Sequence, residues 1–176
     1  TASLRNFQRP AHWPERKPLV AVLAWTLLSN HFHLLLKETT DGGVSKFMQK
    51  VCGSMSKHFN AKYNEKGSLF QGAYHSKTIT SDEYIRYVAA YIMVKNVFDM
   101  HPKGYRYAEK NFNTAWKWAV EYPWSSLSYY AGISEAPEIT SDLLEEIFPP
   151  TTDDFRLFSK DVILGRAKIP DFITDV

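Results

Sequence analysis

The sequence predicts an α+β fold in which an antiparallel sheet carries helices on one face and is followed by a C-terminal helical appendage. Three observations predict it. Two apolar runs meet at a two-residue turn, a long stretch with helical periodicity follows, and a third short apolar run leads into a second helix. The order strand, strand, helix, strand, helix is typical of a ferredoxin-like sheet.

The two apolar runs form the predicted hairpin. Residues 19–28 (LVAVLAWTLL) have the continuous apolar character of a buried strand, and residues 31–37 (HFHLLLK) follow at once. The pair Ser29-Asn30 between them suits a tight turn. We therefore expect two antiparallel strands joined by residues 29 and 30.

The next elements are read from their periodicity. Residues 44–66 predict an amphipathic helix, because apolar residues recur at spacings of three and four from Val44 to Phe59. Residues 69–79 (LFQGAYHSKTI) indicate a third strand. The Ser-Asp-Glu sequence at 81–83 is typical of an N-cap with acids in the first turn, so a second helix is expected to about residue 97.

Composition divides the chain into three predicted parts. Residues 1–18 hold three prolines and no clear period, so we expect an irregular segment before a main domain over 19–132. Residues 133–176 form an acidic segment with short helices. The single Cys52 excludes an intrachain disulfide and fits a reducing compartment, which favours a cytoplasmic location. Neither a signal peptide nor an apolar run long enough to cross a bilayer is recognised, so no membrane partner is expected.

Lysines are concentrated in the middle of the chain. Residues 44–79 contain six lysines against one acid, Glu65, whereas residues 137–176 contain nine acids against four bases. The middle therefore carries a basic field that favours an anionic partner, although a solvated helix face explains the same counts.

Part of this charge forms a stripe. On a helical period Lys46, Lys50 and Lys57 fall within roughly 40° of one another, with Gly53 in the same stripe. Lysines neutralise phosphates and a glycine permits close approach, so the stripe suits a nucleic-acid backbone.

Two histidines stand two residues apart in the predicted second strand. The imidazoles of His31 and His33 should point to one face while Phe32 points to the other. Two neighbouring imidazoles can chelate a divalent metal, although two surface histidines on a hairpin are the simpler alternative. A metal held by two histidines lacks ligands, so a third is expected from another element.

Three tyrosines and a lysine share one face of the predicted second helix. Measured from Tyr91, the others lie within roughly 40° of one line: Tyr84, Tyr87 and Lys95. Tyrosine, with a free pKa of about 10, needs a nearby metal or cation to act as a nucleophile. Lys95 has the charge to serve in this way or to contact a phosphate. Packing in the core is the alternative for the tyrosines, and the stripe alone does not say which of them reacts.

Four segments in this order resemble the HUH-type single-tyrosine transposases, in particular the REP-associated branch of the insertion-sequence-200-like family. They are residues 28–36 (LSNHFHLLL), 63–74 (YNEKGSLFQGAY), 82–96 (DEYIRYVAAYIMVKN) and 122–126 (YPWSS). The resemblance covers about residues 20–132, so the main domain is expected to be the catalytic domain.

The resemblance implies a chemistry and a role for each matching residue. His31 and His33 would hold Mg²⁺ or Mn²⁺, and Tyr91 would attack a phosphate of single-stranded DNA that carries an imperfect hairpin. The products would be a 5′-phosphotyrosine link and a free 3′-hydroxyl, and reversal would rejoin the strand. Such an endonuclease and strand transferase associates with the nucleoid when bound to DNA. Relatives include dimers with shared active sites and monomers, which leaves a homodimer open.

The chain departs from the family at the third metal ligand. The family has a polar residue, often Asn or Gln, four positions after the tyrosine, where this chain has Lys95. Asn96 follows, about 140° from Tyr91 on a regular helix, and reaches the metal only across a π-bulge. Asn96 is therefore the candidate third ligand, and Lys95 joins the three lysines of the stripe as a candidate DNA-binding residue.

The family also has a strand upstream of the hairpin, whereas residues 1–18 predict none, so a sheet edge is expected to be open. Two other functions fit parts of the sequence. A non-catalytic hairpin-binding domain derived from such a transposase would use the basic helix and the aromatic residues, with the histidine pair vestigial. A small-molecule hydrolase with a histidine-bound metal lacks further His, Asp or Glu ligands at recognisable spacing and leaves the lysine stripe without a use.

Overall fold

The computed structural model describes residues 12, 17–140, 142–147 and 153–167, so the predicted irregular segment 1–18 lies almost wholly outside the described residues. The sheet is an antiparallel hairpin of β1 (Val20–Leu27) and β2 (Phe32–Glu38). The Leu28 N–H donates to the His31 carbonyl at 2.8 Å and closes the turn. Both predicted strands of the hairpin are confirmed.

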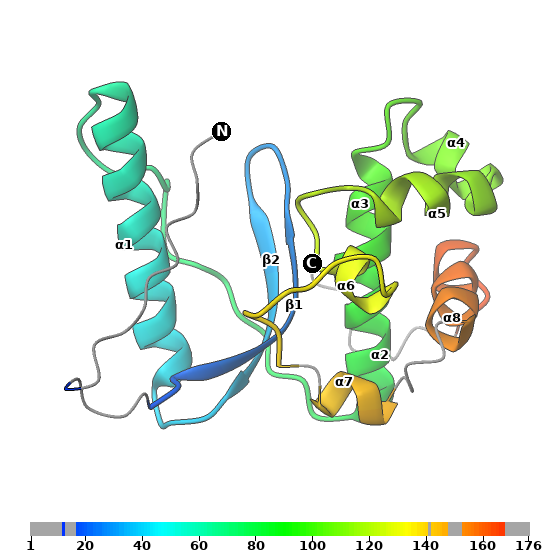
Figure 1. Ribbon diagram of the computed structural model, residues 1–176, viewed down its shortest axis with the longest axis horizontal. Coiled ribbons are helices and arrows are strands. Elements are labelled where there is room, and N and C mark those ends of the chain that lie inside the picture. The colour runs from blue at the N-terminus through cyan, green and yellow to red at the C-terminus, as the bar shows by residue number, and fades with distance from the viewer. Residues whose placement is uncertain (1–11, 13–16, 141, 148–152, 168–176) are drawn as a thin grey trace.

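The helices follow in two groups. The hairpin is followed by α1 (Gly43–Tyr63). Next come α2 (Asp82–Ala90), the π-helix η1 (Tyr91–Lys95) and α3 (Asn96–Asp99), and these last three continue one another as a single helical rod (Figure 1). The shorter helices are α4 (Tyr105–Lys110), α5 (Phe112–Val120), α6 (Leu127–Tyr130), α7 (Asp142–Ile147) and α8 (Asp153–Ile163). Ser81 caps α2 as predicted, because its Oγ accepts the Tyr84 N–H at 3.3 Å. The α+β class with C-terminal helices is confirmed.

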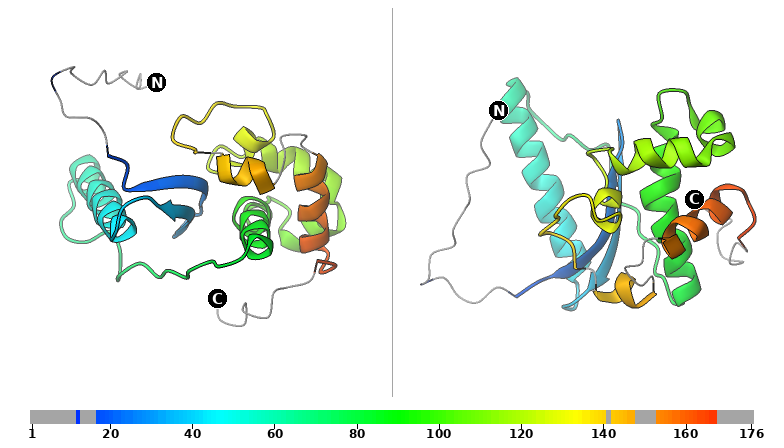
Figure 2. Two further views of the ribbon diagram at one scale, coloured as in Figure 1. Left: turned by 90° about the horizontal axis from the view of Figure 1, so that it is seen from below. Right: turned by 45° about the vertical axis from the view of Figure 1, so that its right-hand side comes forward.

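The helices cover the hairpin from both sides. α1 contacts β1 and β2, η1 contacts the same two strands, and the rod and α1 lie on opposite sides of the hairpin in every view (Figures 1 and 2). The sequence predicts helices on one face of the sheet, whereas the structure places them on both faces of the hairpin. The reason is visible in the sequence, since the apolar run of β1 is continuous rather than alternating and so requires cover on both faces.

The predicted third strand over residues 69–79 is wrong. In the described part of the chain this segment joins no sheet and forms no backbone ladder. Ser68 instead closes a local turn, with its Oγ 3.2 Å from the Phe70 N–H. Side-chain contacts then fasten the segment to its surroundings, with the Phe70 ring against Phe32 and the Tyr74 hydroxyl 2.9 Å from Ser45 Oγ.

The outer edge of β1, which was expected to be open, is paired with later parts of the chain. The Leu27 N–H donates to the Trp124 carbonyl at 2.8 Å, and the Ser126 N–H donates to the Trp25 carbonyl at 3.0 Å. At the other end of the strand the Thr140 N–H donates to the Val22 carbonyl at 2.8 Å. The Tyr-Pro-Trp-Ser-Ser motif therefore satisfies the edge of the sheet beside the hairpin tip.

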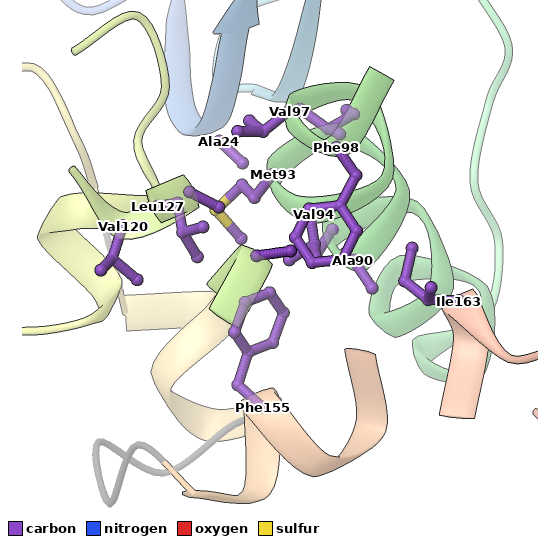
Figure 3. Packing of buried hydrophobic residues seen from close by; sticks show 14 of the residues in the cluster. Ala24, Ala90, Met93, Val94, Val97, Phe98, Val120, Leu127, Phe155 and Ile163 are labelled. Atoms are coloured by element: carbon purple, nitrogen blue, oxygen red, sulfur yellow. The ribbon is translucent and has the colours of Figure 1, made fainter. Parts of the chain in front are cut away.

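One apolar cluster joins the hairpin, the rod and the C-terminal helices (Figure 3). Met93, Val94 and Phe98 of the rod are at most 1% exposed, and Phe155 and Ile163 of α8 pack into the same cluster. The acidic C-terminal segment thus contributes to the core through the apolar face of α8. None of the helices in the described residues is both long enough and apolar enough to cross a membrane.

Candidate active site

Two imidazoles and a phenol meet where the hairpin tip approaches the π-helix. The ring centroids of His31 and His33 are 5.0 Å apart, and those of His33 and Tyr91 are 6.0 Å apart. Both pairs are edge-on, with interplanar angles of 79° and 85°. The structure therefore brings the predicted nucleophile against the predicted metal-binding pair.

Asn30, in the hairpin turn, orients the first imidazole. Its Oδ1 lies 2.7 Å from His31 Nδ1 and, being an acceptor, favours the tautomer with hydrogen on Nδ1. The Nε2 lone pair of His31 then remains available to a metal ion. The turn residue thus orients an imidazole as well as forming the hairpin turn.

His33 is held in a form that suits a metal ligand. Burial lowers its pKa below the ordinary value, and the nearby His31 and Lys95 lower the pKa further. A histidine must be neutral to bind a metal, so these influences favour the competent form. Residues from the hairpin and from the rod combine to produce this effect.

The π-helix changes which side chains share a face with Tyr91. The Asn96 N–H donates to the Tyr91 carbonyl, the i to i+5 bond that defines a π-turn. This is the irregularity on which the assignment of Asn96 as a ligand depends. Asn96 is 2% exposed, and in the described structure its Nδ2 is buried without a hydrogen-bond partner. A buried polar atom of this kind calls for an explanation.

A buried threonine ties the π-helix to the hairpin. Thr26 lies opposite His33 in the hairpin register, and its hydroxyl donates to the carbonyl of Ile92 at 2.7 Å. The Ser125 Oγ lies 3.0 Å from the same hydroxyl. The Thr26 side chain therefore links β1 both to Ile92, the residue after Tyr91, and to Ser125 of the Tyr-Pro-Trp-Ser-Ser motif.

Lys95 lies beside the phenol. Its Nζ is 5.0 Å from the Tyr91 ring centroid and 5.9 Å from that of Tyr105, and it forms a 3.0 Å ion pair with Asp99. Burial opposes the charge on Lys95, but the hydrogen bond to Asp99 and the neighbouring tyrosines and carboxylate raise its pKa. The side chain is therefore held as a cation next to Tyr91.

The other two tyrosines of the stripe are placed differently. Tyr84 is 7% exposed and belongs to the buried interior. Burial raises the pKa of Tyr87, and the neighbouring Tyr91 adds to the rise, so ionisation of Tyr87 is disfavoured. In the described structure Tyr91 is the tyrosine of this stripe whose ring lies against an imidazole.

The lysine stripe lies on the other side of the hairpin from Tyr91. Lys46, Lys50 and Lys57 are all exposed on α1, and a Cβ added at Gly53 would meet open space. The structure thus leaves this surface accessible to a ligand without bringing it into contact with the histidine pair.

Sequence reasoning did not identify every residue of the site. Asn30 was seen only as a turn residue, and Thr26 stood inside an apolar run. Ser125 belongs to a motif whose sequence does not indicate a role for it, and no sequence pattern singles out Asp99. A polar residue inside an apolar strand, such as Thr26, is the signal that was available.

In the described residues no group of three or more His, Cys, Asp and Glu side chains could hold a metal ion. Comparison with protein families finds that residues 15–95 match the model described as "Transposase IS200 like". That range runs from just before the hairpin to the last residue of η1. No curated protein and no solved structure matches the chain.

Proposed function

Residues 15–95 belong to the IS200-like transposase family, and from this premise we propose that the chain cleaves and rejoins single-stranded DNA through Tyr91. The observation that carries the proposal is the 6.0 Å separation of the Tyr91 and His33 rings, beside the paired His31 ring. A single phosphate can contact groups separated by this distance.

In the proposed step the Tyr91 Oη attacks the scissile phosphorus and the bond to the 3′-oxygen breaks. The phenol proton is lost and the departing 3′-oxygen gains a proton, which releases the fragment on the 5′ side of the break. The fragment on the 3′ side stays linked to the protein through its 5′-phosphate, as a phosphotyrosine. The reverse attack by a strand 3′-hydroxyl restores the phosphodiester. One phosphoester replaces another in each direction, so no external energy source is required.

The residues present fit a divalent ion, Mg²⁺ or Mn²⁺, held by His31 and His33 with Asn96 as the third ligand. Asn30 leaves the Nε2 of His31 free, and burial favours neutral His33, whose pKa is lowered. Asn96 is buried one π-turn after Tyr91 and would coordinate through its Oδ1, because the Nδ2 that is without a partner in the described structure is a donor and not a metal ligand. When bound, such an ion would supply Lewis-acid stabilisation of the phosphoryl oxygens.

Lys95 is proposed to contact the same phosphate and to favour the phenoxide. Its ammonium lies over the Tyr91 ring and is fixed by Asp99, so its charge is delivered without ordering a mobile side chain. Lys46, Lys50 and Lys57 are proposed to bind the backbone of the same DNA farther from the cleavage point. DNA containing a hairpin is the proposed substrate, association with the nucleoid follows from it, and a homodimer is compatible with the proposal.

The test is a covalent adduct with single-stranded hairpin oligonucleotides of varied flanking sequence in the presence of Mn²⁺. Because the protein is joined to the 5′-phosphate, a label at the 3′ end should migrate with the protein under denaturing conditions, whereas a 5′ label should not. Tyr91→Phe should abolish the adduct and Tyr87→Phe, on the same helix, should retain it. Salt-sensitive binding without any adduct would instead favour a hairpin-binding domain that has lost catalysis.

A further inference from the structure

An exposed hollow at the carboxyl end of α1 has no part in the proposed cleavage step. It has a volume of about 360 Å³ and is lined by an aromatic pair, Phe59 and Tyr63, together with Leu69. These three side chains are 36%, 55% and 37% exposed. Large apolar side chains gathered in one exposed place are typical of a binding site.

Local hydrogen bonds hold the hollow in shape. Asn64 ends α1 in the left-handed conformation, with φ of 55°, and donates its N–H to the Asn60 carbonyl. The Asn60 Nδ2 in turn donates to the Gly67 carbonyl at 2.9 Å, and the φ of 98° at Gly67 lets the chain reverse. The reversal brings Leu69 to the wall of the hollow, so local backbone geometry and the Asn60 side chain together shape the site.

The surroundings of the aromatic pair indicate the ligand. The two ring centroids are 4.7 Å apart, and the Lys62 Nζ lies 5.1 Å from the centre of the Tyr63 ring. Lys66 also lines the hollow, together with one acid, Glu65. Exposed aromatic rings with adjacent lysines are the combination that proteins use to stack the bases and neutralise the backbone of single-stranded nucleic acid.

The hollow is connected to the hairpin that carries the histidine pair. Leu69 is followed by Phe70, whose ring centroid is 6.0 Å from that of Phe32, and Phe32 stands between the two histidines at the start of β2. The loop that closes the hollow therefore packs directly on the hairpin. The hollow lies on the α1 side of the hairpin, so a DNA strand held at His31 and His33 would pass around the hairpin tip to reach it.

We propose that this hollow stacks an unpaired base that flanks the cleavage point, which makes Tyr63 and Phe59 DNA-positioning residues. The inference rests on the proposed function for its ligand, single-stranded DNA. The hollow differs from the lysine stripe in the part of the DNA it would bind, because a stacking site recognises a base whereas lysines recognise phosphate.

The experiment compares two fluorescent 12-mers, oligo-dT and an abasic strand of the same length, by anisotropy with the full chain in EDTA. Tyr63→Ala should weaken oligo-dT binding about 5- to 100-fold and leave abasic binding unchanged. Tyr63→Phe should retain the wild-type affinity because it keeps the ring. Leu157→Ala, at an apolar side chain on α8 that is 58% exposed, is the matched control and should change neither affinity.

Equal losses for both strands, or no loss for either, would overturn the base-stacking proposal. A DNA-free dimer that Tyr63→Ala converts to monomer in sedimentation, with oligo-dT affinity unchanged, would overturn it in favour of an interface between copies. The adduct assay with the 3′-labelled hairpin is read separately. If no adduct forms but Tyr63→Ala weakens oligo-dT binding as expected, only the cleavage proposal is contradicted. If the adduct forms but Tyr63→Ala has no selective effect, only the base-stacking proposal is contradicted.

Discussion

The two sides of the hairpin are built by different rules. On the side of η1, Thr26 and His33 meet the π-helix through a buried 2.7 Å hydrogen bond and a ring contact. On the side of α1 the surface carries exposed lysines and an exposed aromatic pair. Chemistry at a phosphate requires atoms fixed to within fractions of an ångström, whereas binding a flexible polyanion requires only accessible charge and ring faces. The comparison predicts that substitutions on the first side change the cleavage rate and those on the second change affinity.

The largest effect is expected at the histidine pair. His33→Ala should lower the single-turnover rate of adduct formation by about a hundredfold or more, because the proposed metal site would lose a ligand and the phosphate would lose its Lewis acid. Affinity for the uncleaved hairpin, measured by anisotropy in EDTA, should stay within about twofold. His58→Ala, at an exposed histidine on α1, is the control and should leave the rate unchanged. Equal rates for wild type and His33→Ala would contradict the proposal that His33 holds a metal ion on this side of the hairpin.

The next effect distinguishes Asn96 from Lys95 as the residue that completes the proposed metal site. Asn96→Ala should weaken Mn²⁺ binding about tenfold or more, because the metal then has one ligand fewer, whereas Lys95→Gln should not weaken it. The free Mn²⁺ signal in an electron paramagnetic resonance titration measures both. Thermal unfolding of Asn96→Ala serves as the control for folding. Unchanged Mn²⁺ affinity in a folded Asn96→Ala protein would show that the π-turn does not supply a ligand.

The lysine stripe should give a smaller effect of a different kind. Replacing Lys46, Lys50 and Lys57 together by Gln should weaken hairpin binding about tenfold at moderate salt, and the slope of log affinity against log salt should become shallower by about 0.7 for each phosphate that is no longer neutralised. The rate at saturating DNA should not change. A triple replacement of Lys103, Lys110 and Lys117 by Gln, outside α1, is the charge-matched control. If this control weakened hairpin binding equally, the effect would depend on net charge and not on the position of the lysine stripe.

The mildest effect is expected from the hydrogen bonds behind the site. Thr26→Val removes a buried hydroxyl without changing the shape of the side chain, leaving the Ile92 carbonyl without this donor. We expect the free energy of unfolding to fall by about 1–3 kcal/mol, with a several-fold slower rate. Thr26→Ser should retain most of both because it keeps the hydroxyl. Denaturant titration measures the stability, and a Val variant as stable as wild type would contradict the role given to Thr26.

Local patterns predicted much of the fold, whereas pairings between segments distant in sequence were missed. The hairpin, α1 and the capped start of α2 follow from periodicity and turn chemistry within a few residues. The segment after Gly67 has strand-like composition, but a strand also requires a partner edge, which no local pattern specifies. The cover on β1 comes from Trp124–Ser126, about a hundred residues away, and sequence reasoning had no means of pairing them.

The same division applies to the site. The shared face of His31 and His33 was deduced from the alternation of side chains along a strand, and the Tyr91 face from the helical period. The period of residues 82–97 predicts an ordinary helix, so the sequence indicates the π-helix only as a condition for Asn96 to reach a metal. The contact of Thr26 with Ile92 and Ser125 depends on how the hairpin packs against the rod, which composition does not encode.

The most direct test of the central claim is the identity of the residue that carries the DNA. The adduct formed with a hairpin oligonucleotide should be digested with nuclease and protease and its peptides analysed by mass spectrometry. The account predicts a 5′-phosphonucleotide on Tyr91 and none on Tyr84 or Tyr87. A modification on either of those tyrosines, or an adduct that persists in Tyr91→Phe, would contradict it.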